Sequence, residues 1–190
     1  MAGRPTSHDP RSRRSREQIL AALHRLARAG ELDTISSLSS AAGVTRATFY
    51  NHFDTIEEAA WFALVDSFDH YLAHDLDERR SGVAPEVVGI DSLRRIIVLL
   101  RAEQQLVRLG ENYDDESGLP GLAGIVLTLT RRFRADAGVA STETTDAEDI
   151  YVSAGLYAVM AIGAKGVDDP GQVAATAYSF LPDWMRHPPL

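Results

Sequence analysis

Cysteine is absent from this chain of 190 residues, and so are long apolar runs. Without cysteine the chain forms no disulfide, no CxxC zinc site and no cysteine nucleophile. The longest mostly apolar run without a charge, residues 150–164, is shorter than a helix needs to cross a bilayer. No apolar h-region follows the first residues, so we expect a cytoplasmic protein without a secretory signal or a membrane partner.

Familiar catalytic patterns are also missing. The sequence has no HExxH helix, no Gly-rich phosphate loop and no Ser/His/Asp order of a catalytic triad. His70 and His74 have the i, i+4 spacing of a metal-binding pair and lie beside Asp69 and Asp75, but no third ligand accompanies them. This favours a solvated surface, so we expect no metal, no cofactor and no enzyme activity; an all-α enzyme is kept as a third alternative.

Charge is distributed unevenly along the chain. The net charge is −8, yet residues 1–56 contain eight arginines and five acidic residues. Apolar residues make up 45% of the sequence and charged residues 24%, as in an ordinary globular protein. The asymmetry indicates that the basic part meets an anion, although a basic tail that is merely solvated would look the same.

The N-terminal part is predicted to be an arm followed by a helix. Residues 1–14 are polar, with four arginines and two prolines, which is typical of a flexible arm. Ser15 and Gln18 have the spacing of a capping box, which predicts a helix over residues 16–29.

Two short helices follow, and both have a threonine at the N-cap. Thr34 begins the first and Gly43 ends it; Thr45 then begins the second. Phe49 and Phe53 are spaced i, i+4 and are expected to face the core. Two short helices joined by a glycine turn behind a supporting helix make a helix-turn-helix unit.

The outward face of the third helix carries no acidic residue. If Phe49 and Phe53 face inward, Ala47 and Asn51 are outermost and are flanked by Arg46, Thr48, Tyr50 and His52. Arginine can pair with guanine edges, while threonine, tyrosine and histidine can bond phosphates. This face therefore favours double-stranded DNA as a partner, although a bland surface on a purely structural helix-turn-helix remains the alternative.

The remaining chain is predicted to be helical, so the expected fold class is all-α. Thr55 is expected to begin a helix that continues to about Arg80. Further helices are predicted over residues 91–109, 120–136, 146–165 and 170–181. The helix over 146–165 is apolar nearly all round and rich in alanine and glycine, which suits either a core helix or a dimer interface.

Residues 18–60 resemble the DNA-binding domain of TetR-family transcriptional regulators. The resemblance rests on "ILAALHRLARAG", "ISSLSSAAGVTRATFYNHF" and "TIEEAA", above all on the Ala-Gly-Val turn before the third helix. It implies an arm (1–14), a DNA-binding domain (15–55) and a helical regulatory and dimerisation domain (56–190). Ile56 stands where the family commonly has a lysine that contacts a phosphate.

The resemblance also implies partners and site residues. It implies a homodimer that binds a near-palindromic operator as a repressor and is released by a small-molecule effector. The residues expected to bind DNA are Thr34, Thr45, Arg46, Ala47, Thr48, Tyr50, Asn51 and His52. The residues expected to line a ligand cavity are Trp61, Phe68, Tyr71, Tyr113, Tyr151 and Tyr157. The main alternative is a helical ligand-binding or protein-interaction module.

Overall fold

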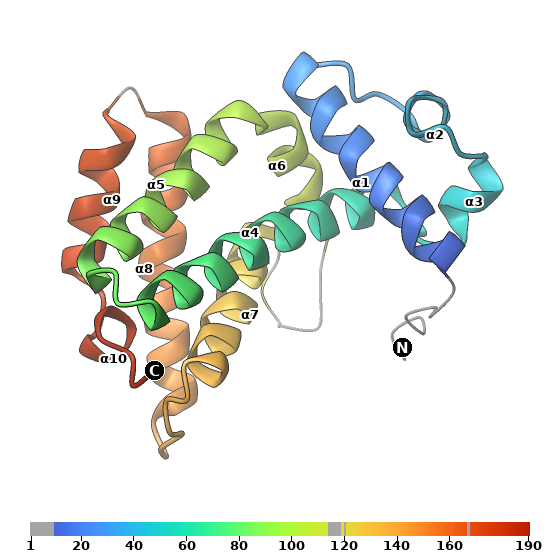
Figure 1. The fold of residues 1–190 in the computed structure, drawn as a ribbon. Helices are drawn as coiled ribbons and strands as arrows, with labels where there is room; N and C mark the ends of the chain where they lie inside the picture. Colours follow the sequence, from blue (N-terminus) through green and yellow to red (C-terminus); the bar gives the residue numbers. More distant parts are fainter. Residues whose placement is uncertain (1–9, 114–118, 120, 167) are drawn as a thin grey trace.

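A computed structural model describes residues 10–113, 119, 121–166 and 168–190 of the chain. These residues form ten α-helices and, within the described ranges, no strand (Figure 1). The all-α fold class predicted from the sequence is therefore confirmed.

The first three helices form a small unit at one end of the molecule. They are α1 (Pro10–Ala29), α2 (Ile35–Ala42) and α3 (Arg46–Tyr50). Their apolar faces meet around five side chains that are fully or almost fully buried: Ile19, Leu23, Leu38, Phe49 and Phe53. The inward orientation predicted for Phe49 and Phe53 is thus confirmed.

The start of α1 differs from the prediction. The helix begins at Pro10, so residues 10–14 are helical; residues 1–9 of the expected arm lie outside the described ranges. Proline suits a first helical position because it lacks the N–H that this turn leaves unpaired. Ser15 lies inside the helix and its hydroxyl donates to the carbonyl of Ser12 at 2.9 Å, so the predicted capping box at Ser15 is wrong.

The three threonine caps are as predicted. The hydroxyls of Thr34, Thr45 and Thr55 accept from the backbone N–H groups three residues later, which satisfies a donor that each helix start leaves free. Gly43 ends α2 with φ of 68°. A side chain would strain this left-handed conformation, so glycine makes the tight turn into α3 possible.

The rest of the chain forms seven helices. They are α4 (Ile56–Arg80), α5 (Pro85–Ala102), α6 (Gln104–Gly110), α7 (Gly121–Asp136), α8 (Thr145–Lys165), α9 (Pro170–Ser179) and the short α10 (Asp183–Arg186). The sequence predicted neither α10 nor the separation of α5 from α6, which it treated as one helix over residues 91–109.

Glu103 is the residue at which α5 ends and α6 begins, with φ of −123° and ψ of 41°. Its side chain is fully buried against α1: Arg28 Nε donates to Oε1 at 2.6 Å, and Oε2 lies 2.5 Å from Nδ1 of His24. Gln105 bonds both the N–H and the carbonyl of Leu32, at 3.1 and 2.8 Å. The break in the helix therefore places four hydrogen bonds between the first unit and the larger helical part.

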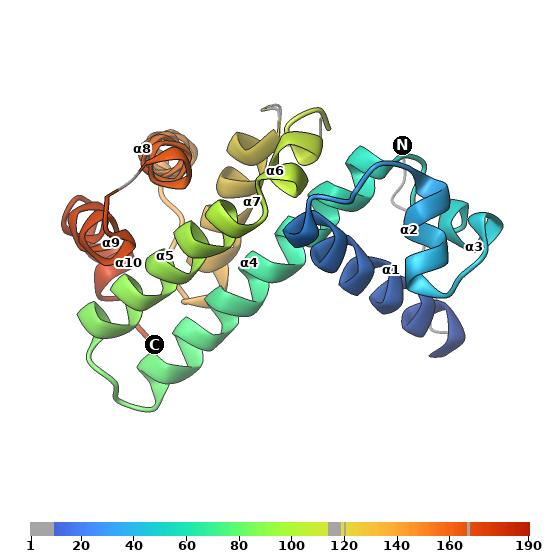
Figure 2. The ribbon, with the colours of Figure 1, turned by 90° about the horizontal axis from the view of Figure 1, so that it is seen from above.

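The long helix α4 connects the two parts of the molecule (Figure 1). It packs against α1, α5, α6 and α7. The pair α8 and α9 lies at the end remote from α1–α3 in both views (Figure 2). None of the helices in the described ranges has the length and apolar character that a membrane span requires.

Candidate DNA-binding and ligand-binding sites

The surface predicted to bind DNA consists of α3 and the residues that flank it. Arg46, Ala47, Tyr50 and Asn51 are exposed, as the helical wheel predicted, and Thr48 is half-exposed. Within the described residues no carboxylate forms an ion pair with Arg46. The guanidinium is therefore available to an external acceptor such as a base edge or a phosphate.

Thr34 and Thr45 are also N-caps, because their hydroxyls accept hydrogen bonds from backbone N–H groups. Thr45 accepts from the N–H of Thr48 at 3.0 Å, and the two hydroxyls lie 2.8 Å apart. Thr34 is exposed at the start of α2 and shares a reciprocal set of bonds with Ser37. These caps fix the starts of α2 and α3, and DNA contacts by Thr34, Thr45 and Thr48 stay predictions.

Side chains of α1 hold the recognition helix in place. His52 is half-buried, with Nε2 lying 2.7 Å from Ser15 Oγ, so it links the end of α3 to α1. Arg25 donates to the carbonyl of Ala41 at 2.7 Å and ties α2 to the same helix. The guanidinium of Arg16 lies over the ring of Phe53 at 5.7 Å. A phosphate contact by His52 stays a prediction, since its ring already has this structural contact.

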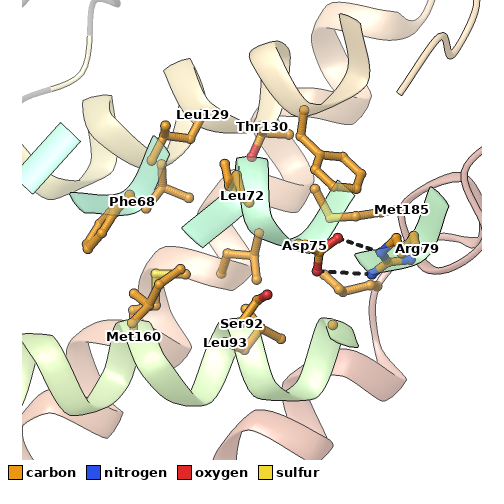
Figure 3. Close-up of a pocket in the computed structure, with 16 residues that line it drawn as sticks. Phe68, Leu72, Asp75, Arg79, Ser92, Leu93, Leu129, Thr130, Met160 and Met185 are labelled. Carbon is orange, nitrogen blue, oxygen red and sulfur yellow. Dashed lines mark hydrogen bonds and ion pairs between the residues drawn. The ribbon is translucent and has the colours of Figure 1, made fainter. Parts of the chain in front are cut away.

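A cavity of about 70 Å³ lies within the larger helical part (Figure 3). Its walls come from α4, α5, α7 and α8, and the C-terminal segment adds Leu181 and Met185. Most lining side chains are aliphatic, thioether or phenyl groups, as in typical small-molecule sites. Phe68 and Leu72 of α4 form part of the wall, so a molecule bound here contacts the helix that leads to α3.

One wall of this cavity is polar. Arg79 Nε donates to Oδ1 of Asp75 at 2.5 Å, and Nη2 donates to Oδ2 at 3.3 Å; both residues are buried. Arg79 Nη1 also donates to the carbonyl of Arg186 at 2.7 Å, and the Tyr178 hydroxyl donates to the same oxygen at 3.3 Å. Burial raises the pKa of Tyr178, which keeps this hydroxyl protonated and able to donate. The pair thus fixes the C-terminal segment against α4.

The six residues predicted to bind ligand are not brought together. Phe68 alone lines this cavity. Trp61 is buried elsewhere, with its ring 5.5 Å from that of Tyr113, and Tyr71 is half-buried. Tyr151 and Tyr157 are exposed on α8. Ligand binding by the residues outside the cavity stays a prediction.

Most residues that line the cavity were not predicted from the sequence. Ser92 and Leu93 of α5, Thr130 of α7 and Met160 of α8 line it, as does the pair Asp75–Arg79. A carboxylate and a guanidinium spaced i, i+4 among the apolar positions of α4 could have indicated a buried pair. The opposing residues of α5, α7 and α8 carry no comparable pattern.

An apolar face covers the outer side of α8 and α9. Tyr151 and Phe180 are each 83% exposed and Ile162 is 70% exposed, with Ala154, Gly155 and Ala158 exposed between them. Small residues allow a second helix to approach closely. Exposed apolar area of this kind marks interaction surfaces in soluble proteins.

The paired histidines of α4 lie on its surface. His74 is 3.5 Å from a carboxylate oxygen of Glu78, and His70 is exposed beside Tyr71. Among the described residues, no group of three or more histidine or acidic side chains is placed to hold a metal ion.

The comparisons with known proteins bear on the fold. No protein-family model matches the chain, and no curated protein matches it. Among solved structures it is similar to RolR, a TetR-family regulator in complex with its ligand resorcinol. The TM-score is 0.57 at 20% identity, and the match covers 88% of this chain and 86% of RolR. The chain therefore has the fold of a TetR-family regulator, which confirms the fold that residues 18–60 suggested.

Proposed function

We propose that the protein is a sequence-specific DNA-binding transcriptional regulator. The observation that carries this proposal is the exposed face of α3, where Arg46, Tyr50 and Asn51 project together without an acidic neighbour on the helix. A cationic, hydrogen-bonding helix held against a supporting helix suits the major groove, where bases and phosphates are both within reach. The TetR-type fold, established over 88% of the chain, supports the same function.

The proposal includes control by a small molecule, with DNA released when the effector binds. RolR, which shares the fold, was solved with resorcinol, and the present chain has its own cavity beside α4. Phe68, Leu72 and Asp75 of α4 contact the cavity, and only five residues separate the start of this helix from the end of α3. A ligand that packs against α4 can displace α3, provided that it binds the two positions of α4 with different affinities.

The functional unit is proposed to be a homodimer. The exposed apolar face of α8 and α9 supports this assembly, since a two-fold dimer buries the same patch on both subunits. Two copies of α3 then address successive major grooves, about 34–36 Å apart, so the operator is expected to be a near-palindrome. The proposed location is the cytoplasm, where the operator DNA is.

The test is selection of a binding site from random duplexes, followed by measurement of affinity on the selected site and on a scrambled one. A regulator selects a near-palindromic sequence and binds it at least a thousandfold more tightly than the scrambled duplex. Equal, weak binding to every duplex would instead favour a ligand-binding or protein-interaction module in which the helix-turn-helix is structural. Selection of a single half-site would contradict the dimeric part of the proposal.

A further inference from the structure

The cavity beside α4 has a specific chemistry. We infer that its ligand is a compact neutral ring compound that bears a hydroxyl group, and that this hydroxyl donates a hydrogen bond to Asp75. The inference rests on the proposed function, because it names the class of effector that this site takes. It is carried by the composition of the walls and by the bonds within the Asp75–Arg79 pair.

The net charge of the lining side chains excludes ionic ligands. Asp75 and Arg79 are the ionisable residues of the wall, and they neutralise each other through two hydrogen bonds. A carboxylate or an ammonium group brought into this cavity would be buried without a counter-ion, which costs several kcal/mol. The ligand must therefore be neutral, and the surrounding Phe68, Leu72 and Met160 require most of its surface to be apolar.

The free acceptor capacity of the wall specifies the polar group. A carboxylate accepts about four hydrogen bonds, and Arg79 supplies two to Asp75. The carboxylate oxygens of Asp75 thus have lone pairs that can accept further hydrogen bonds. One N–H group of the Arg79 guanidinium already donates to the carbonyl of Arg186. Figure 3 draws bonds within the Asp75–Arg79 pair and none from Ser92 or Thr130 to another lining residue. A ligand that donates a hydrogen bond finds an acceptor here, and the two hydroxyls can adapt to a second polar atom.

The size and shape of the cavity favour a small ring. A volume of about 70 Å³ suits a compact molecule rather than an extended chain. Met160 and Met185 both line the cavity, and methionine adjusts easily to the outline of a ring. Leucine, isoleucine and phenylalanine side chains complete an apolar environment that suits an aromatic or alicyclic ring.

The experiment titrates the full-length protein by calorimetry with four probes of one ring size: phenol, anisole, benzylamine and benzoate. Phenol can donate to Asp75 whereas anisole cannot, and a hydrogen bond to a charged acceptor makes phenol bind roughly tenfold more tightly or better. Equal binding of phenol and anisole, tighter binding of either ionic probe, or no binding of any probe overturns the inference. This comparison uses the wild-type protein, so it does not depend on whether a variant folds.

Two matched double variants locate the site. Asp75→Leu with Arg79→Met replaces the ion pair of the cavity with apolar side chains, removes the acceptor, and should abolish the preference for phenol over anisole. Asp149→Leu with Arg134→Met replaces another buried pair, bonded at 2.8 Å but outside the cavity, and should preserve the preference. The inference is overturned if the Asp75/Arg79 double variant still prefers phenol over anisole. It is also overturned if both double variants lose this preference. The affinity for DNA is measured in parallel. If the protein prefers phenol but does not bind DNA, the proposed function is wrong and this inference stands. If the protein binds DNA but does not prefer phenol, this inference is wrong and the proposed function stands.

Discussion

Arg46 and Tyr50 stand four residues apart on the exposed face of α3 and are expected to contribute differently to DNA binding. A guanidinium can pair in bidentate fashion with guanine, so Arg46→Ala should weaken operator binding by about 1–3 kcal/mol and relax the preference at one base per half-site. Tyr50→Phe removes a hydroxyl that is proposed to bond a phosphate, so it should weaken binding to all sequences alike. Affinities of both variants for the selected operator and for single-base variants of it separate the two roles. Wild-type affinity in both would show that α3 does not face DNA.

Ile56 is the first residue of α4 and is half-buried near the recognition helix. A lysine there can bury its aliphatic stem and place the ammonium at the surface, where a phosphate would lie. Ile56→Lys should therefore tighten DNA binding and steepen the dependence of affinity on salt by roughly one unit per subunit. Ile56→Gln is the matched control, because it is polar but uncharged and should leave the slope as in wild type. A slope that is unchanged in the lysine variant would place Ile56 away from the DNA backbone.

At the scale of elements, the starts of α2, α3 and α4 could be predicted from the sequence because each depends on a threonine and the residues next to it. Thr34, Thr45 and Thr55 bond groups three residues away, so the spacing in the sequence contains the reason for each start. The break at Glu103 has a different cause, because its partners lie 75 and 79 residues earlier on α1. The cavity was missed for a similar reason: periodicity gives the inward face of α4 but not the residues of α5, α7 and α8 that lie opposite.

The contact between α6 and α1 is expected to stabilise the molecule. Glu103→Gln keeps the shape of the side chain but replaces an acceptor oxygen with a donor facing His24 or Arg28. Loss of a buried, charge-assisted bond should lower the free energy of unfolding by about 1–3 kcal/mol. Asp77→Asn is the control, since its ion pair with Arg80 at 3.4 Å is exposed and worth about 0–1 kcal/mol. Denaturant unfolding measures both, and equal small losses would show that the Glu103 contact contributes little.

At the scale of the whole molecule, one helix, α4, connects the two proposed sites. The start of α4 follows α3, and its middle lines the cavity that the ligand is proposed to occupy. The α5 helix provides a second connection, because Ser92 and Leu93 line the same cavity and the helix ends at Glu103, which is bonded to α1. A ligand that moves α4 away from α5 would therefore act on the proposed DNA-binding unit through both helices.

The proposed dimer would join two such molecules, and Ala158 lies in the exposed apolar face of α8 that is proposed to form the interface. Ala158→Arg places a charge where the partner's apolar helix would pack, and a charge buried without a counter-ion is strongly unfavourable. Because Ala158 is exposed in the single chain, the variant should remain folded but become monomeric, and its operator affinity should fall with the loss of the second α3. Ala147→Arg, at an exposed position in the first turn of α8, is the matched control for an added charge on this helix. Light-scattering mass and circular dichroism at micromolar concentration decide the outcome: a monomeric wild type, or a dimeric Ala158→Arg variant, would mean that this face of α8 does not form the dimer.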